Sequence, residues 1–546
     1  MYAIFYFCGI GGYMPGSRTM TRRKMIKLSA ATLLTLTPLS TISCGKRLTS
    51  VDIDIDTDIY QEREYIKCTD VISIKEKKET LPNIILILSD DMGYGDIGCY
   101  GNKAINTPHI DRLAREGMRF TDFYCASPLC SPSRAGILTG RYPLRCGITF
   151  PLQPGKDTFM RKIVKELGYM FGALGVVDLY GAKNLVNGLP HSEITIAQAL
   201  KLRNYATCAI GKWHLGDFVV DESYHPHNYG FDTFVGFNAS NDDWPVSFFK
   251  DKKMIIQDIG LGQQQYTELF TQEAVQFINT NRDNPFFLYL AHKDPHQPCF
   301  PSKRFEGSTK AGPHGDTVAE VDWSVGQILQ CLKKNNIDTK TLVIFNSDNG
   351  PWFDGSTGGL RGRKGESYEG GFRVPMIAWW PGVIKEGIVC DQPAMNIDFF
   401  PTICNIAGLT LPKDRVIDGK DLMPLLTGKS KQSPHDALYF FHYREIEGIR
   451  FGKWKYIRYN NTRGWPVPLD KPDTFFGSAA GGHDYMPPGS NEKVPTLASW
   501  PVLYDMQYDK SESYNVIKRH PDIAKKLHEK LITFEKEFYA NIRGWK

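Results

Sequence analysis

Four short, mostly apolar runs of strand length constrain the fold of this chain most strongly. They are Ile84–Leu88, Ala206–Ile210, Phe286–Ala291 and Leu342–Phe345. Continuous apolar runs are typical of strands buried on both faces, as in parallel sheets. Helical patterns alternate with them: Ile110–Met118, which Thr107-Pro108 is expected to cap, Glu268–Asn279 and Val318–Lys333. This alternation predicts an α/β fold, with a mainly parallel sheet flanked by helices on both faces.

The composition changes after Gly428. Leu438–Tyr459 is rich in Tyr, Phe, Ile and Arg and predicts antiparallel strands, whereas Thr462–Trp500 is a long Gly- and Pro-containing loop of the kind that covers functional sites. An amphipathic helix is predicted from His520 to Tyr539. We therefore expect a smaller C-terminal α+β domain with an antiparallel sheet. The predicted organisation is a signal segment at 1–44, a tether at 45–80, a catalytic domain at 81–430 and the C-terminal domain at 431–546.

The N-terminal segment predicts export. Arg22, Arg23, Lys24 and Lys27 precede a short apolar run, Leu28–Ile42, which is typical of a secretory signal and short for a membrane span. The run ends at Cys44, in a sequence that resembles a bacterial lipobox with Thr41 in place of the usual leucine. We expect lipidated Cys44 to anchor a periplasmic or outer-membrane lipoprotein, and Met20 to be the initiator. The alternative is ordinary signal cleavage without an anchor.

The charge balance gives no reason to expect a nucleic-acid partner. The chain has 65 Lys and Arg against 60 Asp and Glu, and the five additional basic residues all lie in 1–44. The remaining chain has no basic excess, which nucleic-acid-binding domains usually show. Twelve cysteines without a CxxC pair do not suggest a disulfide framework or a zinc module.

Acidic pairs follow two of the predicted strands. Asp90 and Asp91 come directly after the first run, and Asp348 and Asn349 follow the run that ends at Phe345. The carboxyl ends of parallel strands meet at one edge of a sheet, where α/β proteins bind ligands. Adjacent carboxylates repel each other unless a cation lies between them. An all-oxygen set of this kind favours a hard divalent ion, with Ca²⁺ expected ahead of Mg²⁺.

A twelve-residue run, Cys130-Ser-Pro-Ser-Arg-Ala-Gly-Ile-Leu-Thr-Gly-Arg141, contains the most specific motif. Pro132 is suited to the first turn of a helix and Gly140 to its end. Residue 130 is therefore expected at a helix N-terminus, where free N–H groups favour an anion.

This run resembles the signature of type I sulfatases, and four further motifs resemble the same family. They are the segments around Asp90, Lys212-Trp213-His214, His296 and Lys364. Gly188–Glu193 places the chain near arylsulfatase A and N-acetylgalactosamine-6-sulfatase. The resemblance covers about Leu81 to Leu426 and implies an alkaline-phosphatase-like fold. It also implies that a maturase converts Cys130 to formylglycine, also called 3-oxoalanine.

The resemblance implies a role for each matching residue. Residue 130 joins Asp90, Asp91, Asp348 and Asn349 as a metal ligand and provides the nucleophile. Arg134, Lys212 and Lys364 stabilise the sulfate oxygens, and Ser240 is a candidate sulfate contact. His296 protonates the leaving group, and His214 accepts a proton from the second hydroxyl of the hydrated aldehyde.

The implied activity is hydrolysis of sulfate esters, of O-sulfated carbohydrate such as galactose or N-acetylgalactosamine sulfate, or of an aryl sulfate. Two alternatives stay open: a phosphoesterase or phosphonate hydrolase of the alkaline phosphatase superfamily, and a non-catalytic glycan-binding relative. Candidate sugar contacts are Asn241, Asp242, Asp243, Trp244, His442, Arg444 and Trp465.

Overall fold

A computed structural model describes residues 57–60, 66–76, 80–153, 184–243, 245–459 and 501–546. Thr57–Lys546 forms one compact unit. The predicted signal segment, Cys44, the segment 155–183 and the predicted loop 462–500 lie outside the described residues. No helix within the described ranges combines the length and apolar character needed to cross a bilayer.

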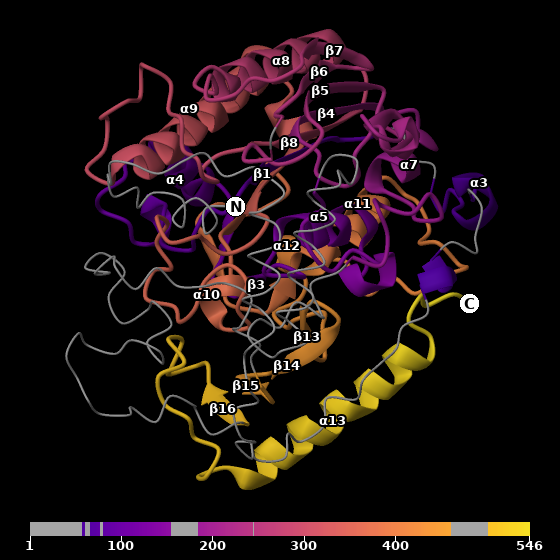
Figure 1. Ribbon diagram of the computed structural model, residues 1–546, viewed down its shortest axis with the longest axis vertical. Coiled ribbons are helices and arrows are strands. Elements are labelled where there is room, and N and C mark those ends of the chain that lie inside the picture. Colours follow the sequence, from indigo (N-terminus) through magenta and orange to yellow (C-terminus); the bar gives the residue numbers. More distant parts are fainter. Residues whose placement is uncertain (1–56, 61–65, 77–79, 154–183, 244, 460–500) are drawn as a thin grey trace, which may run out of the picture. The chain divides into compact units, whose positions relative to one another are not determined.

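The core of the protein is a ten-stranded sheet (Figure 1). In spatial order its strands are β11 (Ile388–Cys390), β2 (Met118–Phe120), β10 (Met376–Trp379), β9 (Thr341–Ser347), β1 (Asn83–Ser89), β8 (Phe286–Ala291), β4 (Ala206–Lys212), β5 (Thr233–Phe237), β6 (Phe248–Lys250) and β7 (Lys253–Ile256). The strands β9, β1, β8, β4 and β5 are parallel to their neighbours in this set. The four apolar runs therefore become adjacent central strands, which confirms the prediction of a mainly parallel sheet. A separate pair is formed by β3 (Phe123–Tyr124) and β12 (Ala394–Met395).

Helices cover the sheet on both faces. The helices of the described residues are α3 (Cys68–Val71), α4 (Pro108–Arg115), α5 (Cys130–Thr139), α7 (Ile196–Lys201), α8 (Tyr266–Asn281), α9 (Gly312–Lys334), α10 (Glu369–Phe372), α11 (Phe399–Ile406), α12 (Met423–Leu426) and α13 (Pro521–Ala540). Ile85 and Ile87 of β1 share a buried cluster with Phe270 of α8 and Val325 of α9. Figure 1 shows α5 and α11 on the other side of β1. Side chains alternate along a strand, so both faces of β1 must be covered.

The start and end of α4 differ from the prediction. The helix ends at Arg115, and Met118 begins β2 instead of continuing the helix. Thr107 occupies the N-cap position, but its side chain makes no capping bond. Asp322 of α9 accepts from the backbone N–H groups of His109 and Ile110 at 3.0 and 2.7 Å. A carboxylate distant in sequence thus satisfies free donors of the first turn, which a local motif could not reveal.

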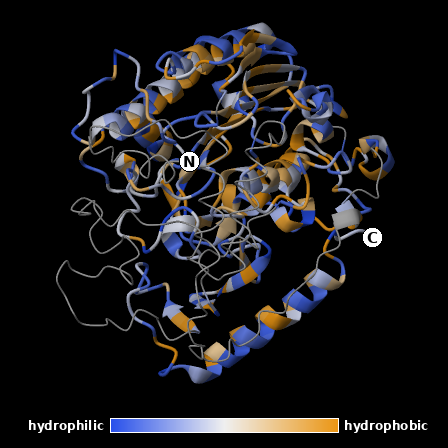
Figure 2. Ribbon diagram, viewed as in Figure 1, coloured by the Kyte–Doolittle hydropathy of each residue, from blue (hydrophilic) through white to orange (hydrophobic). Residues whose placement is uncertain are grey.

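The C-terminal residues form a second, antiparallel sheet, as predicted. Its order is β13 (Leu438–His442), β14 (Glu445–Phe451), β15 (Trp454–Ile457) and β16 (Val502–Asp505). Helix α13 contacts β14 and β15. Figure 2 shows hydrophobic and hydrophilic bands alternating along α13. Its buried residues Ala524, Leu527, Leu531 and Phe538 recur at helical spacing, which is how an amphipathic helix packs on a sheet.

Part of the segment predicted as a tether contacts the folded unit. The hydroxyl of Tyr60 donates to the backbone oxygen of Leu144 at 2.7 Å, and Ile74 pairs with Leu409 in an isolated bridge. The boundaries 45–80, 81–430 and 431–546 remain predictions.

A buried ionic cluster joins the C-terminal sheet to the segment before β10. Lys455 of β15 lies 2.8 Å from Glu369 of α10 and 2.9 Å from Glu512, and all three side chains are fully buried. Glu512 also accepts from the backbone N–H of Glu369 at 2.6 Å. Removing one partner from such a cluster leaves an uncompensated buried charge.

We therefore expect Lys455→Met to destabilise the protein by about 3–5 kcal/mol, measured as a shift in the midpoint of denaturant unfolding. Lys453→Met is the matched control, because Lys453 is 43% exposed and its ion pair with Asp505 lies at the surface. An exposed pair contributes about 0–1 kcal/mol. Equally small shifts for both variants would show that the cluster does not hold the sheet in place.

Candidate active site

The predicted metal ligands meet at the carboxyl edge of the central sheet. Asp90 and Asp91 follow β1, and Asp348 and Asn349 follow its neighbour β9. Asp91 has φ of 62°, a left-handed conformation that is strained for a residue with a side chain and frequent at functional sites. Its backbone N–H donates to Asp348 Oδ1 at 3.1 Å, and Asn349 Nδ2 donates to Asp91 Oδ1 at 2.7 Å.

These residues fit a hard divalent cation. Asp90 Oδ1 and Asn349 Oδ1 are buried and have no hydrogen-bond partner among the described residues. Burial and the neighbouring charge of Asp90 raise the pKa of Asp348 to about 7. Burial alone would also raise the pKa of Asp90, but nearby cations, Lys212 foremost, outweigh it and hold that pKa well below its usual range. A cation between the carboxylates would satisfy the free oxygens and relieve this repulsion.

Cys130 is the first residue of α5, as the sequence predicts. The helix ends at Gly140, whose φ of 69° is the left-handed conformation that glycine adopts easily. The thiol is 1% exposed and lies 3.9 Å from Asp91 Oδ1. Ligand atoms of Asp90, Asp91, Cys130 and His296 all lie within 4.8 Å of one another. Burial raises the pKa of the Cys130 thiol, so an unmodified cysteine here is a protonated, poor nucleophile.

Three cations converge on the same carboxylates. Lys212, at the end of β4, lies 2.6 Å from Asp90 Oδ2, and Lys364 lies 2.8 Å from the Asp91 carboxylate. Arg134, one turn into α5, donates from Nε to Asp348 Oδ2 at 2.9 Å. These three cations lie where they would also stabilise the negative charge of an anionic ester.

The two predicted catalytic histidines approach the cluster with their ring orientation fixed. His296 Nδ1 lies 2.5 Å from the Gln297 carbonyl oxygen, and Nε2 lies 3.6 Å from Asp91 Oδ2. His214 Nε2 lies 2.7 Å from the Leu152 carbonyl oxygen. Carbonyl oxygens only accept, so these ring nitrogens are the donors. His214 Nδ1 therefore has a lone pair, and it is buried without a partner among the described residues.

The environment of His214 favours a base. Burial and the charge of Lys212 hold the pKa of His214 well below its usual range, so the ring is neutral. Ser240 is also buried and accepts from Lys212 Nζ at 3.0 Å, next to the predicted sulfate position. The structure thus brings together the predicted metal ligands, the predicted catalytic residues and Ser240.

Exposure indicates where substrate enters. The side chains of Lys212 and Arg134 are fully buried, whereas that of His296 is 10% exposed and that of Lys364 is 6% exposed. The site therefore opens beside His296 and Lys364. A leaving group would extend past His296.

Two predicted sugar contacts need correction because their side chains are buried. Asn241 is fully buried, and its amide donates to the backbone oxygens of His296 and Pro298 at 3.4 Å. His442 is 1% exposed and lies 3.1 Å from Glu447. Both were selected as polar loop residues, and both hold neighbouring segments in place instead. Trp244 and Trp465 lie outside the described residues.

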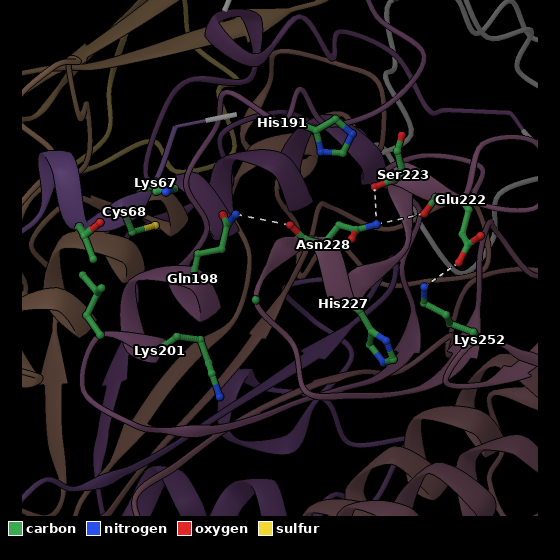
Figure 3. A pocket seen from close by; sticks show the side chains of 13 residues that line it. Lys67, Cys68, His191, Gln198, Lys201, Glu222, Ser223, His227, Asn228 and Lys252 are labelled. Atoms are coloured by element: carbon green, nitrogen blue, oxygen red, sulfur yellow. Dashed lines mark hydrogen bonds and ion pairs between the residues drawn. The ribbon is translucent and has the colours of Figure 1, made fainter. Parts of the chain in front are cut away.

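A surface pocket of about 970 Å³ lies elsewhere and contains none of the predicted catalytic residues (Figure 3). Several of its polar side chains donate hydrogen bonds to other residues that line the pocket. Gln198 donates to the Asn228 backbone oxygen, Asn228 to the backbone oxygen of Glu222, and Lys252 to the Glu222 carboxylate. The predicted catalytic residues lie at the carboxyl edge of the sheet and not in this pocket.

Acidic residues, cations and two histidines at the carboxyl edge of a mainly parallel sheet define a hydrolase site for an anionic ester. The Sulfatase family model matches residues 82–409, and the model of the N-sulphoglucosamine sulphohydrolase C-terminal region matches 363–467. The chain therefore belongs to the sulfatase family. It is a sulfuric ester hydrolase with the alkaline-phosphatase-like fold.

Comparisons with individual proteins also support membership of the sulfatase family. The chain is 37% identical to the steryl-sulfatase of Homo sapiens over 452 residues, covering 68% of this chain and 74% of the relative. It is 37% identical to the N-acetylgalactosamine-6-sulfatase of Homo sapiens over 387 residues, covering 66% and 68%. The crystal structure of Ps i-CgsB matches with a TM-score of 0.65 at 28% identity, covering 83% of this chain and 93% of that one.

Proposed function

We propose that this protein hydrolyses sulfate esters of carbohydrates through a formylglycine formed from Cys130. The supporting observation is the position of residue 130, at the start of α5 and within 4.8 Å of Asp90, Asp91 and His296. A hydrated aldehyde at this position would supply an oxygen nucleophile. Asp90, Asp91, Asp348, Asn349 and residue 130 would hold Ca²⁺, which would lower the pKa of that hydroxyl.

Other side chains of the protein bind the sulfate group and transfer protons. Lys212, Lys364 and Arg134 stabilise negative charge on the sulfate oxygens, and the Ser240 hydroxyl lies beside Lys212 to contact one of them. His296, at the open side of the site, gives a proton from Nε2 to the leaving oxygen. His214 accepts a proton at Nδ1, the nitrogen that its contact with Leu152 leaves free.

A sugar substrate is supported by two relatives. One is an N-acetylgalactosamine-6-sulfatase, and Ps i-CgsB has been solved in complex with k-i-k-neocarrahexaose. We therefore place galactose or N-acetylgalactosamine sulfate first among substrates, ahead of steryl and aryl sulfates. We further propose export through the segment 1–44, a membrane anchor at Cys44 and a maturase partner that oxidises Cys130.

A panel of defined esters tests this function. The panel contains the sulfate esters of galactose, N-acetylgalactosamine, a sterol and nitrophenol, together with the phosphate ester of each. We expect kcat/KM to be highest for a sulfated sugar and far lower for every phosphate. Faster turnover of the phosphates would identify a phosphoesterase or phosphonate hydrolase, and no turnover by protein that carries the aldehyde would identify a glycan-binding protein.

The role of His296 gives a prediction that depends on the leaving group. His296→Ala should lower kcat on a sugar sulfate by about 10²–10⁴, the usual contribution of a general acid. The loss should be much smaller on nitrophenyl sulfate, whose leaving group departs without protonation. Both substrates are measured with the same enzyme preparation. Equal losses would show that His296 binds sulfate and does not transfer the proton.

A further inference from the structure

The Leu152 backbone links the cysteine signature to the proposed base. The hydroxyl of Ser131, the residue after Cys130, accepts from the Leu152 N–H at 2.9 Å. The carbonyl oxygen of the same Leu152 lies 2.7 Å from His214 Nε2. One residue thus connects the second residue of α5 to the histidine two residues after the end of β4.

This connection is buried along its length. Ser131 is fully buried, Leu152 is 7% exposed and His214 is 3% exposed. A buried hydroxyl is costly unless it is hydrogen-bonded, and Ser131 satisfies the Leu152 N–H. The segment is also held before Leu152, because Asn184 Oδ1 accepts from the N–H groups of Thr149 and Phe150 at 2.9 Å. Leu152 is therefore held through its own N–H and through the contacts of Thr149 and Phe150, which place its carbonyl oxygen beside His214.

His214 needs such a fixed partner. Its φ of 55° is left-handed and strained, so its backbone does not rest in an ordinary conformation. A second acceptor, Asp243 Oδ2, lies 3.9 Å from the same Nε2. The Leu152 carbonyl makes the shorter contact, and it keeps the hydrogen on Nε2 and the lone pair on Nδ1. Without it the ring could turn toward Asp243 or exchange its tautomer.

We propose that Ser131 is a positioning residue: through the Leu152 backbone it fixes the ring of His214 with Nδ1 free to accept a proton. The inference rests on the proposed function, because it concerns the base of that reaction. Position 131 lies between Cys130 and Pro132, so a substitution there leaves Cys130, Pro132 and Arg134 in place.

The test compares Ser131→Ala and Ser131→Thr with the wild-type full chain. For each protein the fraction carrying an aldehyde at residue 130 is measured by mass spectrometry, and rates are given per converted site. We expect Ser131→Ala to lower kcat by about 10–100-fold, because misplacing a catalytic group costs this much. KM should fall with kcat and leave kcat/KM nearly unchanged, because the slowed step follows leaving-group departure. Threonine keeps the hydroxyl and should restore most of the rate.

Comparing the rates on two substrates identifies which step of the reaction Ser131→Ala slows. His214 acts after the leaving group has departed, on an intermediate that is the same for every substrate. Ser131→Ala should therefore bring kcat on a sugar sulfate and kcat on nitrophenyl sulfate toward one common value. It should also release a burst of nitrophenol, one per converted site, before slow turnover. Nitrogen NMR of the His214 ring, assigned with His214→Gln, should show a single Nε2–H tautomer in wild type and a mixture in Ser131→Ala.

Ser324→Ala is the matched control. Ser324 lies in α9 and is equally buried, and its hydroxyl bonds to Thr271 and His292. It should keep kcat and show no burst. An unchanged tautomer and kcat in Ser131→Ala, or a loss matching that of Ser324→Ala, would overturn the inference. If His214→Ala then still abolishes sulfate release, the proposed function survives and only the role of Ser131 fails. A wild-type protein without sulfatase turnover would instead refute the proposed function.

Discussion

Cys130→Ala should lose essentially all sulfatase turnover while folding normally. The substitution removes the side chain from which the proposed nucleophile is made, and the described site offers no substitute at that position. Ligand atoms of Asp90, Asp91 and His296 lie within 4.8 Å of the Cys130 sulfur, and the proposed mechanism uses these three residues as metal ligands and acid. A small side chain at the start of α5 keeps the helix and its Gly140 end.

Cys125→Ala provides the matched control. Cys125 is also fully buried, five positions earlier, but its sulfur contacts the Gly371 backbone oxygen instead of the acidic cluster. It should keep near-wild-type kcat, and both variants should show wild-type circular dichroism. Substantial turnover by Cys130→Ala would contradict the proposed mechanism.

Asp91→Ala should cost both activity and metal-dependent stability. Asp91 contacts Asn349, Lys364 and His296, so its loss removes a proposed ligand and frees a buried cation. A ligand that binds only the folded state stabilises it by about 2.7 kcal/mol at a concentration of 100 Kd. Adding Ca²⁺ to metal-free wild-type protein should therefore raise the unfolding midpoint and restore turnover.

The same titration of Asp91→Ala should give little stabilisation and no recovery of turnover. Wild-type protein passed through a chelator without added Ca²⁺ gives the baseline for both. Elemental analysis of active enzyme should find Ca²⁺, or Mg²⁺ in its place. Zinc, or no divalent ion in active enzyme, would show that the oxygen ligands serve another purpose.

The sequence was sufficient to predict the central sheet and the assembly of the site. The apolar runs are long and strand-like, and parallel strands place their carboxyl ends along one edge, so Asp90 and Asp348 had to meet. Short elements were not predictable in the same way. Only Glu116 and Gly117 separate α4 from β2, which is three residues long, and β10 and β2 owe their antiparallel positions to long-range pairing.

Contacts made by backbone atoms also could not be predicted from the sequence. Leu152 approaches His214 with a carbonyl oxygen that every residue has, so no side-chain pattern marks it. Asn241 and His442 illustrate the opposite case. Each is a polar side chain in a segment that reads as surface loop or strand, but tertiary packing buries it. Packing against distant segments determines whether Asn241 and His442 are buried, and a local sequence pattern contains no information about that packing.

The mass of the peptide that contains residue 130 tests the central claim most directly. Trypsin should release Phe120–Arg134 from active enzyme, with Cys125 and residue 130 in one fragment. Conversion of the thiol to an aldehyde lowers the mass by about 18 Da, and fragmentation assigns the change to residue 130. We predict that the converted fraction rises in proportion to specific activity across preparations. Fully active enzyme with an unmodified thiol at residue 130 would contradict the account.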